Sequence, residues 1–449
     1  MARPASLSGF PEWLPAQRIV EQHVLDTLRR TFELWGLLSI ETRAVEPLEQ
    51  LLSKGEVEKE VYLLRRLHDD PADAGDERGG RQLALHFDLT VPLARYVLEN
   101  AGRLQFPFRR YQIQKVWRGE RPQEGRFREF TQADVDVIGD GELPFHYEVE
   151  LPLVMADALT ALRPIGLPSF TIRVNNRKVA EGFYRGLGLQ DVGGVLRTVD
   201  KLDKIGPERV AELLIAENGA DARQAGMCLA LAEIRSPDVS FVQRVRGLGV
   251  EHPLLDEGLM ELARVVEAAG EHVPGVLVAD LRIARGLDYY TGTVYETVLD
   301  EHPDLGSICS GGRYDQLAGD ERNVYPGVGL SIGVTRLVSA LVGLGLSRAT
   351  RSVPTCVLVA LPDEKRRSEC DLIARALRER GIPVEVSPSG AKYGRQIRYA
   401  DRRGIPFVWF PGDDGDDEVR DIRSGEQVPA DAAGWEPPDE DRCPRVVPG

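Results

Sequence analysis

The chain has 449 residues, more than a single hydrophobic core supports, and therefore predicts two or three domains. Hydrophobic residues make up 42% of the sequence and charged residues 28%, which is typical of a globular protein and excludes a disordered or collagen-like chain. The formal net charge of −15 opposes nucleic-acid binding over the whole surface, so any such site has to be a local basic patch.

The five cysteines are scattered without a C-x-x-C pair, which favours free thiols in a reducing compartment and argues against a zinc site. The N-terminus lacks the apolar core of a signal peptide, and no apolar run approaches the ~18 residues of a membrane span. We therefore expect a cytoplasmic protein.

The first predicted element is a long amphipathic helix, because apolar residues recur at helical spacing from Ala16 to Trp35. The segment from Arg81 to Asn100 begins with strand-like alternation and takes helical spacing after Pro92. Asp88 and Thr90 lie at the turn between these two parts. They either belong to a polar site or simply cap the helix, and the pattern alone does not decide between the two.

Two strand-like runs flank the turn-like sequence RPQEG at 121–125 and predict a long antiparallel hairpin with a basic loop. One interpretation is a solvent-exposed edge hairpin that its charges protect from pairing. However, four polar residues fall within the strands, namely Arg118, Gln132, Asp134 and Asp136. An arginine, an amide and carboxylates on one sheet face favour a polar pocket, and the local positive charge of the hairpin suits a phosphate-rich ligand.

A helical insertion and an unusual strand follow. From about Asp191 to Ala269 the pattern is helical and polar and contains no catalytic cluster. The sequence RGLDYYTGTVYE at 285–296 then places charges and two tyrosines where a strand would alternate apolar and polar residues. A departure of this kind is typical of a functional site.

The sequence PGVGLSIGVTRL at 326–337 carries three glycines, Gly327, Gly329 and Gly333, that miss the Rossmann pattern by one position. We interpret it as a strand whose missing side chains let a flat ring lie against the backbone. Arg336, which opens the following helix, either meets a phosphate or lies on the helix surface.

After Leu346, short strands and helices alternate, which predicts a small α/β domain with a largely parallel sheet. The sequences GDDGDDEV and EPPDEDRCPRVVPG are expected to form an acidic loop and a frayed tail. One helix of this domain is basic and forms either a binding surface or a solvated face. Its basic residues are Lys392, Arg395, Arg398, Arg402 and Arg403.

Four segments together resemble the histidyl-tRNA synthetase family. VWRGERPQEGRFREFTQADVDVIG resembles motif 2 of the class II aminoacyl-tRNA synthetases, and GVGLSIGVTRL resembles their motif 3. RGLDYYTGTVYE and SGGRYD resemble the two signatures peculiar to histidyl-tRNA synthetases. The segments occur in the family's order and spacing, and the similarity runs from about Phe10 to Val428.

The resemblance implies an α+β fold, with a class II antiparallel sheet flanked by helices at 1–345. A helical insertion domain would interrupt it at about 191–269, and a C-terminal α/β anticodon-binding domain with an acidic tail would occupy 354–449. It also implies a homodimer that acts as a histidine–tRNA ligase. Histidine and ATP would give histidyl-adenylate and pyrophosphate, and histidine would then pass to the 3′ end of histidine tRNA.

The resemblance further implies that ATP is used with Mg²⁺ and that there is no prosthetic group. Arg118 and Arg285 would be the catalytic residues, because both would lie beside the α-phosphate and Arg285 would also bind the carboxylate of histidine. The residues that contact ATP would be Arg118, Glu120, Arg126 and Arg336.

The amino-acid site and the tRNA contact are implied in the same way. The α-amino group of histidine would be bound by Asp88, Thr90 and Gln132, and its imidazole by Asp136, Tyr289 and Tyr290. Arg121 and Gln123 would contact the acceptor end of the tRNA. Because a site that hydrogen-bonds both ring nitrogens rejects other side chains strongly, no editing domain is expected.

Three residues depart from the family pattern or have no assigned role. Arg43 stands where motif 1 usually has a proline, which bears on the dimer interface. Thr335 stands where motif 3 commonly has an acid, directly before Arg336, and no role follows for Asp288.

Two rival functions remain. A regulatory subunit of ATP phosphoribosyltransferase would lack the anticodon-binding domain and usually the RGLDYY sequence, whereas this chain has both. A specialised duplicate, serving antibiotic self-resistance or transferring histidine to another acceptor, is not excluded by the sequence.

Overall fold

The computed structural model of the chain describes residues 5–52, 60–67, 82–123, 125–283, 289–319 and 323–449. These residues form two compact units. The first contains Val24–Arg163 and Leu167–Ala340, and the second contains Leu341–Gly449 together with Glu12–His23 and Pro164–Gly166. Helices α1 (Pro15–Leu34) and α11 (Val334–Gly343) contribute to both units.

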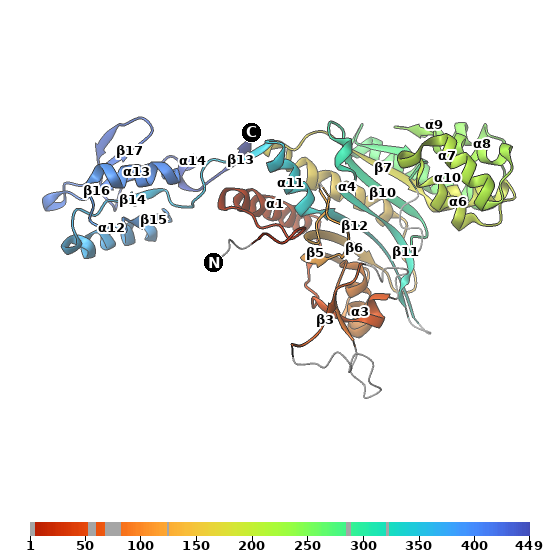
Figure 1. Ribbon diagram of the computed structural model, residues 1–449, viewed down its shortest axis with the longest axis horizontal. Coiled ribbons are helices and arrows are strands. Elements are labelled where there is room, and N and C mark those ends of the chain that lie inside the picture. The colour runs from red at the N-terminus through yellow and green to blue at the C-terminus, as the bar shows by residue number, and fades with distance from the viewer. Residues whose placement is uncertain (1–4, 53–59, 68–81, 124, 284–288, 320–322) are drawn as a thin grey trace. The chain divides into compact units, whose positions relative to one another are not determined.

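The first unit is built on a nine-stranded sheet with the order β1-β5-β6-β12-β11-β10-β7-β9-β8 (Figure 1). Neighbouring strands are antiparallel except for the parallel pairs β1·β5 and β7·β9. In sheet order the strands are Leu38–Ser39, Phe108–Trp117, Glu129–Ile138, Val324–Gly333, Cys309–Gly319, Thr293–Leu299, Phe170–Asn176, Leu277–Asp280 and Arg235–Ser236. A large, mostly antiparallel sheet with helices confirms the predicted α+β class.

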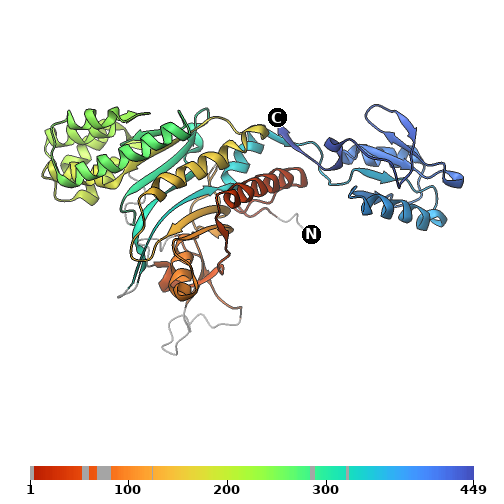
Figure 2. The same ribbon diagram turned by 180° about the vertical axis from the view of Figure 1, so that it is seen from behind.

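Helices α4 (His146–Thr160) and α10 (Pro253–His272) run across one face of this sheet, as Figure 2 shows. Helix α4 packs on β6 and β12, while α10 packs on β7, β9 and α4. The alternation within β6 explains this cover, since Ala133, Val135 and Val137 are fully buried on one side of the strand. The polar residues between them lie on the other side of the sheet.

The predicted hairpin is confirmed as β5 and β6, which pair in one continuous antiparallel register. Its interpretation as a solvated edge is wrong, because β6 lies between β5 and β12 in the interior of the sheet. Arg110, Asp134 and Asp136 are buried and so do not protect an edge, whereas Lys115 of β5 remains exposed.

The segment around Asp88 differs slightly from its prediction. Strand β4 covers Leu83–Leu85, and helix α3 covers Thr90–Asn100, so the helix begins before Pro92 and not after it. A proline is tolerated in the first turn of a helix because the N–H groups there have no partner within the helix. Helix α3 packs against β11. The neighbouring elements are α2 (Leu48–Leu52), β2 (Val45–Pro47) and β3 (Leu63–Leu64), and the small sheet has the order β2-β4-β3.

The helical segment predicted near 191–269 forms a group of helices, seen in green in Figure 1. Its members before α10 are α6 (Val192–Val199), α7 (Leu202–Asn218), α8 (Ala222–Ala232) and α9 (Ser240–Arg246). Helix α5 (Arg177–Gly186) packs on both α6 and α10, and so connects this group with the sheet.

The second unit contains a five-stranded sheet with the order β15-β14-β16-β17-β18. The strands are Val384–Val386, Val357–Val359, Phe407–Phe410, Glu418–Asp421 and Gln427–Pro429. The first three are parallel, as predicted, and the last two are antiparallel additions. Helices α12 (Arg367–Glu379) and α13 (Tyr393–Arg403) cover opposite faces, since Val357 and Val359 share a core with α12 while Leu358 shares one with α13.

Of the two expectations for the end of the chain, one is confirmed and one is wrong. The acidic sequence GDDGDDEV forms a loop with a 3-10 turn at Asp413–Gly415, and only its last two residues belong to strand β17, which pairs with β16. The tail is not frayed, because β19 (Val446–Pro448) pairs with β13 (Ser347–Ala349) after the short helix α14 (Asp439–Arg442).

Short 3-10 turns lie at Ala101–Arg103, Arg163–Ile165, Pro303–Leu305, Glu364–Arg366 and Asp413–Gly415. In the described part of the chain, no helix has both the length and the apolar character needed to cross a membrane.

Candidate active site

The floor of the candidate site is the polar face of β6, which carries Gln132, Asp134 and Asp136 at alternating positions. All three side chains are buried. Their partners across the sheet are Gln114, Gln112 and Arg110 on β5, and Gly333, Ser331 and Gly329 on β12. Residues that the sequence places about 200 positions apart thus form one polar surface.

Asp136 is fixed by two strong interactions. Arg110, which is fully buried, forms an ion pair with it at 2.6 Å between Nη2 and Oδ2. The hydroxyl of Tyr314 donates to its other oxygen, Oδ1, at 2.6 Å. Burial and the neighbouring Asp136 raise the pKa of Tyr314 well above its ordinary value, so this phenol remains a hydrogen-bond donor.

The glycines of β12 serve the side chains around them. A Cβ on Gly329 would lie 1.9 Å from Oδ1 of Asp136, and one on Gly327 would lie 2.4 Å from the ring of Tyr314. The flat ring predicted to lie against this strand is thus, at Gly327, the ring of Tyr314. Gly333 has no atom closer than 3.8 Å to such a Cβ and lines an open pocket instead.

That pocket, with a volume of about 140 Å³, brings together the four residues expected to contact ATP. They are Arg118, Glu120, Arg126 and Arg336, and Gln132 and Ser331 line the same pocket. Glu120 lies between two of the arginines, 3.9 Å from Arg118 and 3.5 Å from Arg126. Arg118 lies just after the end of β5, and not within a strand as expected, while Arg126 lies in the hairpin loop and Arg336 in α11, so distant parts of the chain converge on one space.

Two of the three arginines of the pocket, Arg118 and Arg336, are held by different contacts. The guanidinium of Arg118 lies over the ring of Phe130, 5.1 Å from its centroid, and Nε donates to the carbonyl of Phe87 at 3.0 Å. Nε of Arg336 donates to the carbonyl of Gly125 at 2.7 Å, and Nη1 donates to the carbonyl of Ser307. The interpretation of Arg336 as a surface residue of a core helix is therefore wrong.

Thr335, one of the departures from the family pattern, has a structural role beside Arg336. Its side chain is buried, and Oγ1 accepts a hydrogen bond from the backbone N–H of Thr131 at 2.8 Å. The contact ties the start of α11 to β6, so the threonine supports the helix that carries Arg336.

Asp88 and Thr90 lie at the start of α3, next to the floor. Oδ1 of Asp88 accepts from the backbone N–H of Val91 at 3.1 Å, so the capping interpretation is correct for this residue. Asp88 is also buried, and it lies close enough to Asp134 to raise the pKa of Asp134. Asp88 can therefore both cap the helix and belong to the polar site. Thr90 is the first residue of the helix and is half-buried.

Tyr289 and Tyr290 lie beside Asp136. Their ring centroids are 4.1 Å apart, and the ring of Tyr290 packs close to the backbone of Gly312 on β11. Burial, followed by the proximity of Tyr289 and of Asp136, raises the pKa of Tyr290 well above its ordinary value. Arg285 and Asp288, which precede the tyrosines, lie outside the described residues.

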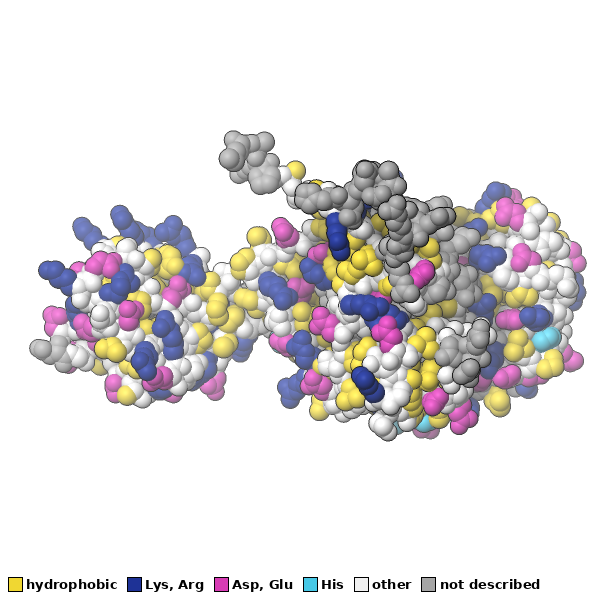
Figure 3. Space-filling view, turned by 90° about the horizontal axis from the view of Figure 1, so that it is seen from below, with side chains coloured by type: hydrophobic (Ala, Val, Ile, Leu, Met, Phe, Trp, Pro, Cys, Tyr) yellow, Lys and Arg dark blue, Asp and Glu magenta, His cyan; other side chains and the backbone are white. Residues whose placement is uncertain are grey.

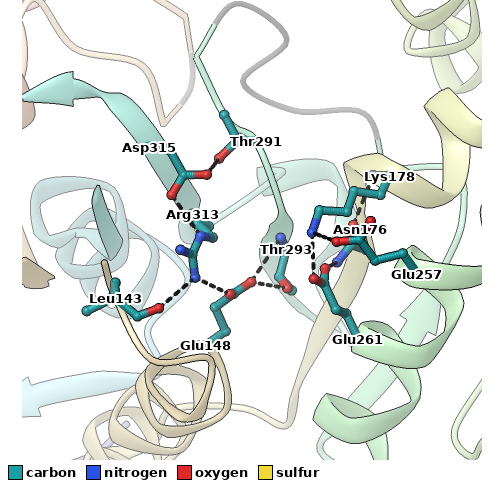
Figure 4. A network of polar contacts seen from close by, with 10 residues as sticks. All are labelled: Leu143, Glu148, Asn176, Lys178, Glu257, Glu261, Thr291, Thr293, Arg313 and Asp315. Atoms are coloured by element: carbon teal, nitrogen blue, oxygen red, sulfur yellow. Dashed lines mark hydrogen bonds and ion pairs between the residues drawn. The ribbon is translucent and has the colours of Figure 1, made fainter. Parts of the chain in front are cut away.

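A network of polar contacts holds the segment that follows the tyrosines (Figure 4). Arg313 on β11 pairs with Glu148 of α4 at 2.8 Å and with Asp315 at 2.9 Å. Glu148 in turn accepts from the side chain of Thr293, and Asp315 accepts from that of Thr291, each at 2.5 Å. The SGGRYD signature thereby anchors the end of the RGLDYY signature.

The same picture shows how β10 approaches the group of helices around α10. Asn176, which pairs with Thr293 across the sheet, donates to Glu261 of α10 at 2.8 Å. Lys178 forms ion pairs with Glu257 and Glu261 at 2.7 and 2.6 Å. The helix is thus bound to the strands beside the tyrosine segment.

Several residues of the site were missed by reasoning from the sequence as functional candidates: Glu60, Arg110, Glu148, Arg313, Tyr314 and Ser331. Glu60 lies near Arg118, Glu120 and Arg126, and burial raises the pKa of its carboxyl. Tyr314 and Arg313 belong to the quoted SGGRYD sequence, so that signature was the available signal. Ser331 lies within the quoted motif 3 sequence. Glu60, Arg110 and Glu148 lie outside the quoted motifs, and long-range strand and helix packing brings them to the site.

The predicted tRNA contacts lie on exposed surfaces. Arg121 and Gln123 are exposed in the hairpin loop, where the backbone of Gln123 pairs with that of Arg126. In the second unit Lys392, Arg395, Arg398 and Arg402 are exposed along α13. Arg403 is different, since it forms an ion pair with Glu385 at 2.7 Å. Figure 3 shows Lys and Arg side chains gathered along one border of this unit.

Comparison with known proteins identifies the family. The family model described as histidyl-tRNA synthetase matches residues 9–337, and the one described as anticodon binding domain matches residues 355–433. Histidine–tRNA ligases of Micrococcus luteus and Cutibacterium acnes are 65% and 59% identical, and each comparison covers 100% of this chain and 99% of the relative. The crystal structure of histidyl-tRNA synthetase from Nostoc sp. PCC 7120 matches with a TM-score of 0.82 and 36% identity, over 95% of this chain and 97% of that one. The chain therefore belongs to the histidyl-tRNA synthetase family.

Proposed function

We propose that the protein activates histidine with ATP, forming histidyl-adenylate and pyrophosphate, and then transfers histidine to the 3′ end of histidine tRNA. The observation that carries this proposal is a pocket in which Arg118, Arg126 and Arg336 line the same space as Gln132, a residue of the polar face of β6. Such a pocket offers cations to a triphosphate, and the buried Asp134 and Asp136 continue the polar face beside it. The full-length relatives named as histidine–tRNA ligases support the same reaction.

The first step requires no strong base, because the carboxylate of histidine is already a nucleophile. It attacks the α-phosphate of ATP, and pyrophosphate leaves from the opposite side. In such a reaction the protein contributes alignment of the reactants and positive charge where negative charge develops. Arg118 and Arg285 would supply that charge at the α-phosphate, and Arg336 at the γ-phosphate.

ATP would be used with Mg²⁺, and the residues of the pocket fit this ion. Mg²⁺ is usually bound by one or two carboxylates together with substrate phosphates. Glu120 lines the pocket between the arginines and is the residue that would hold the ion at the phosphates. When bound, Mg²⁺ supplies further positive charge to the triphosphate. We propose that the protein uses no prosthetic group.

The amino-acid end of the pocket supports selection of histidine. Asp136 is held in one orientation by Arg110 and Tyr314, and Tyr289 and Tyr290 lie next to it. A ligand without ring nitrogens would leave these buried polar groups unpaired. Unpaired groups of this kind can lower the kcat/KM for an analogue by a factor of about 10⁴ to 10⁵. We therefore propose that Asp136 and the two tyrosines bind the imidazole, while Asp88, Thr90 and Gln132 bind the α-amino group.

We further propose that Arg121 and Gln123 contact the acceptor end of the tRNA and that the exposed cations of α13 contact its anticodon stem. A basic helix face within a chain of net charge −15 gives phosphates a local attractive surface. The protein would act in the cytoplasm.

The proposed assembly is a homodimer, as the family implies. Arg43, at the position in motif 1 where the family usually has proline, forms an ion pair with Glu46 at 3.1 Å. Glu46 is fully buried and also pairs with Arg95 at 2.8 Å. Arg43 thus has a partner within its own chain, which is consistent with a changed interface that still dimerises.

The proposal is tested by measuring ATP–pyrophosphate exchange with each amino acid in turn. We expect exchange that depends on histidine and is negligible with other amino acids. Absence of histidine-dependent exchange in folded protein would overturn the assigned reaction.

A further inference from the structure

Two oxygen atoms on the polar face of β6 lack a hydrogen-bond partner among the described residues: Oε1 of Gln132, which lines the pocket, and Oδ1 of Asp134, which lies two residues further along the strand. Both atoms are buried, and both side chains lie on the same face of β6. Buried acceptors are nearly always paired in native proteins. Two unpaired acceptors side by side therefore indicate a ligand that donates hydrogen bonds.

The contacts of Ser331 explain why these two oxygen atoms have no hydrogen-bond partner among the described residues. Nε2 of Gln132 donates to Oγ of Ser331 at 2.7 Å. Ser331 also lies close enough to Asp134 to lower the pKa of that carboxyl. The hydroxyl of Ser331 accepts from Gln132, so its own hydrogen remains available to Asp134. This arrangement directs the amide nitrogen of Gln132 toward Ser331 and leaves its oxygen available for a ligand.

The charges around Asp134 define what kind of ligand fits. The groups that face it are Asp136 of β6, Arg110 of β5, Ser331 of β12, Cys309 of β11 and Asp88 before α3. Arg110 forms an ion pair with Asp136 at 2.6 Å, although its Nε and Nη2 make no hydrogen bond among the described residues, and its single positive charge faces three carboxyl groups. Burial raises the pKa of Asp134 to about 7, and the neighbouring carboxylates add to the rise. A ligand with a positive charge would offset this excess of carboxylates.

The α-ammonium group of an amino acid meets both requirements, because it carries one positive charge and three N–H donors. A neutral imidazole has one N–H and no charge. We propose that Asp134, together with Gln132, binds the α-ammonium group of the substrate histidine. This inference rests on the proposed function and adds Asp134 to the residues assigned to the amino-acid site.

It follows that histidine binding deprotonates Asp134. Near neutral pH the empty protein holds a proton on this carboxyl in part of the molecules. The arriving ammonium group favours the ionised carboxylate, so the proton leaves as histidine binds. Imidazolepropionate, which is histidine without its amino group, would bind without this release.

The first test compares the wild type with Asp134→Asn, and Asp280→Asn serves as a control because Asp280 is a buried aspartate at the end of β9 in the same sheet. Binding of histidine and of imidazolepropionate is measured by calorimetry at about pH 8, where Asp134 is mostly ionised. We expect Asp134→Asn to raise the Kd for histidine about tenfold to a hundredfold, as for loss of a hydrogen bond to a charged group. Its Kd for imidazolepropionate and its KM for ATP should stay within about twofold of the wild type.

The second test uses the wild type alone, so it stands even if the variant fails to fold. Calorimetry in buffers of different ionisation enthalpy gives the number of protons released on binding. The count is corrected for the protons that each ligand's own imidazole releases on binding, since the α-ammonium group of histidine lowers the pKa of its ring. After this correction we expect more protons released with histidine than with imidazolepropionate near pH 7, by about half a proton.

Equal proton release for both ligands, or equal loss of both affinities in Asp134→Asn, would overturn the assignment of Asp134. An unchanged Kd for histidine in that variant would do the same. If the wild type shows neither histidine binding nor exchange, the proposed function itself fails. If the wild type shows normal exchange and Asp134→Asn binds histidine as tightly as the wild type, only the inference about Asp134 is rejected.

Discussion

Replacement of Arg313 by methionine should destabilise the sheet beside the tyrosines and weaken histidine binding. The side chain of Glu148 is only 1% exposed, and Arg313 is its cationic partner at 2.8 Å. Without Arg313, Glu148 keeps its bonds to Thr293 but remains a buried charge without compensation. Removing one partner of a buried ion pair costs about 3 to 5 kcal/mol, which is the loss we expect for Arg313→Met.

The double variant Arg313→Met/Glu148→Gln separates this electrostatic cost from lost packing. The glutamine carries no charge and still offers an oxygen to Thr293, so we expect the double variant to recover at least about 2 kcal/mol relative to Arg313→Met. Stability is best followed by hydrogen exchange of peptides from β10 and β11, which reports this part of the sheet directly. The arrangement also predicts a higher KM for histidine than for the wild type, because Asp315 and the backbone of Arg313 hold Thr291 next to Tyr290.

A change of less than about 1 kcal/mol for Arg313→Met would refute this reasoning, because a loss of that size is typical of an exposed ion pair. A double variant no more stable than Arg313→Met would show that lost packing, and not the uncompensated carboxylate, causes the effect.

Three further predictions concern the pocket. The pKa of Asp134 is raised to about 7 in the folded protein, so its contribution to stability is complete below the unfolded value of 3.8 and is lost as the pH rises through about 7. The loss is on the order of 4 kcal/mol. In urea titrations, the free energy of unfolding of Asp134→Asn should therefore increase relative to that of the wild type as the pH rises over this range. A difference that does not depend on pH would contradict the raised pKa of Asp134. Arg336→Ala should raise the KM for ATP about tenfold or more, since a charged hydrogen bond to phosphate would be lost. The Kd for histidine, measured by calorimetry, should stay unchanged. An unchanged KM for ATP would exclude the proposed contact between Arg336 and ATP. Gly329→Ala should cost about 1 to 3 kcal/mol of unfolding free energy, because the new Cβ would lie 1.9 Å from Oδ1 of Asp136; wild-type stability would show that Asp136 moves without cost.

Much of the site was predictable from local sequence. The alternation of polar and apolar residues in β6 predicted that Gln132, Asp134 and Asp136 share one face, and the basic hairpin predicted a phosphate-binding element. The quoted motifs predicted most of the pocket residues, because residues near a strand end or hairpin loop remain close in space to their sequence neighbours.

The remaining features depend on long-range pairing, which local patterns do not encode. That β6 is an interior strand depends on β12, whose Gly333 pairs with Gln132. The order of the C-terminal tail depends on pairing of Val446 with Ala349. The sequence placed Asp134 on the polar face, but only the structure shows which oxygen atoms of that face remain without a partner among the described residues.

The central claim is that the protein attaches histidine to tRNA, and the most direct measurement is aminoacylation of a histidine tRNA transcript with labelled histidine. We expect labelled tRNA to accumulate when ATP and Mg²⁺ are present and not when ATP is omitted. Folded protein that catalyses histidine-dependent exchange but leaves the transcript uncharged would contradict the claim and would point to another acceptor for the activated histidine.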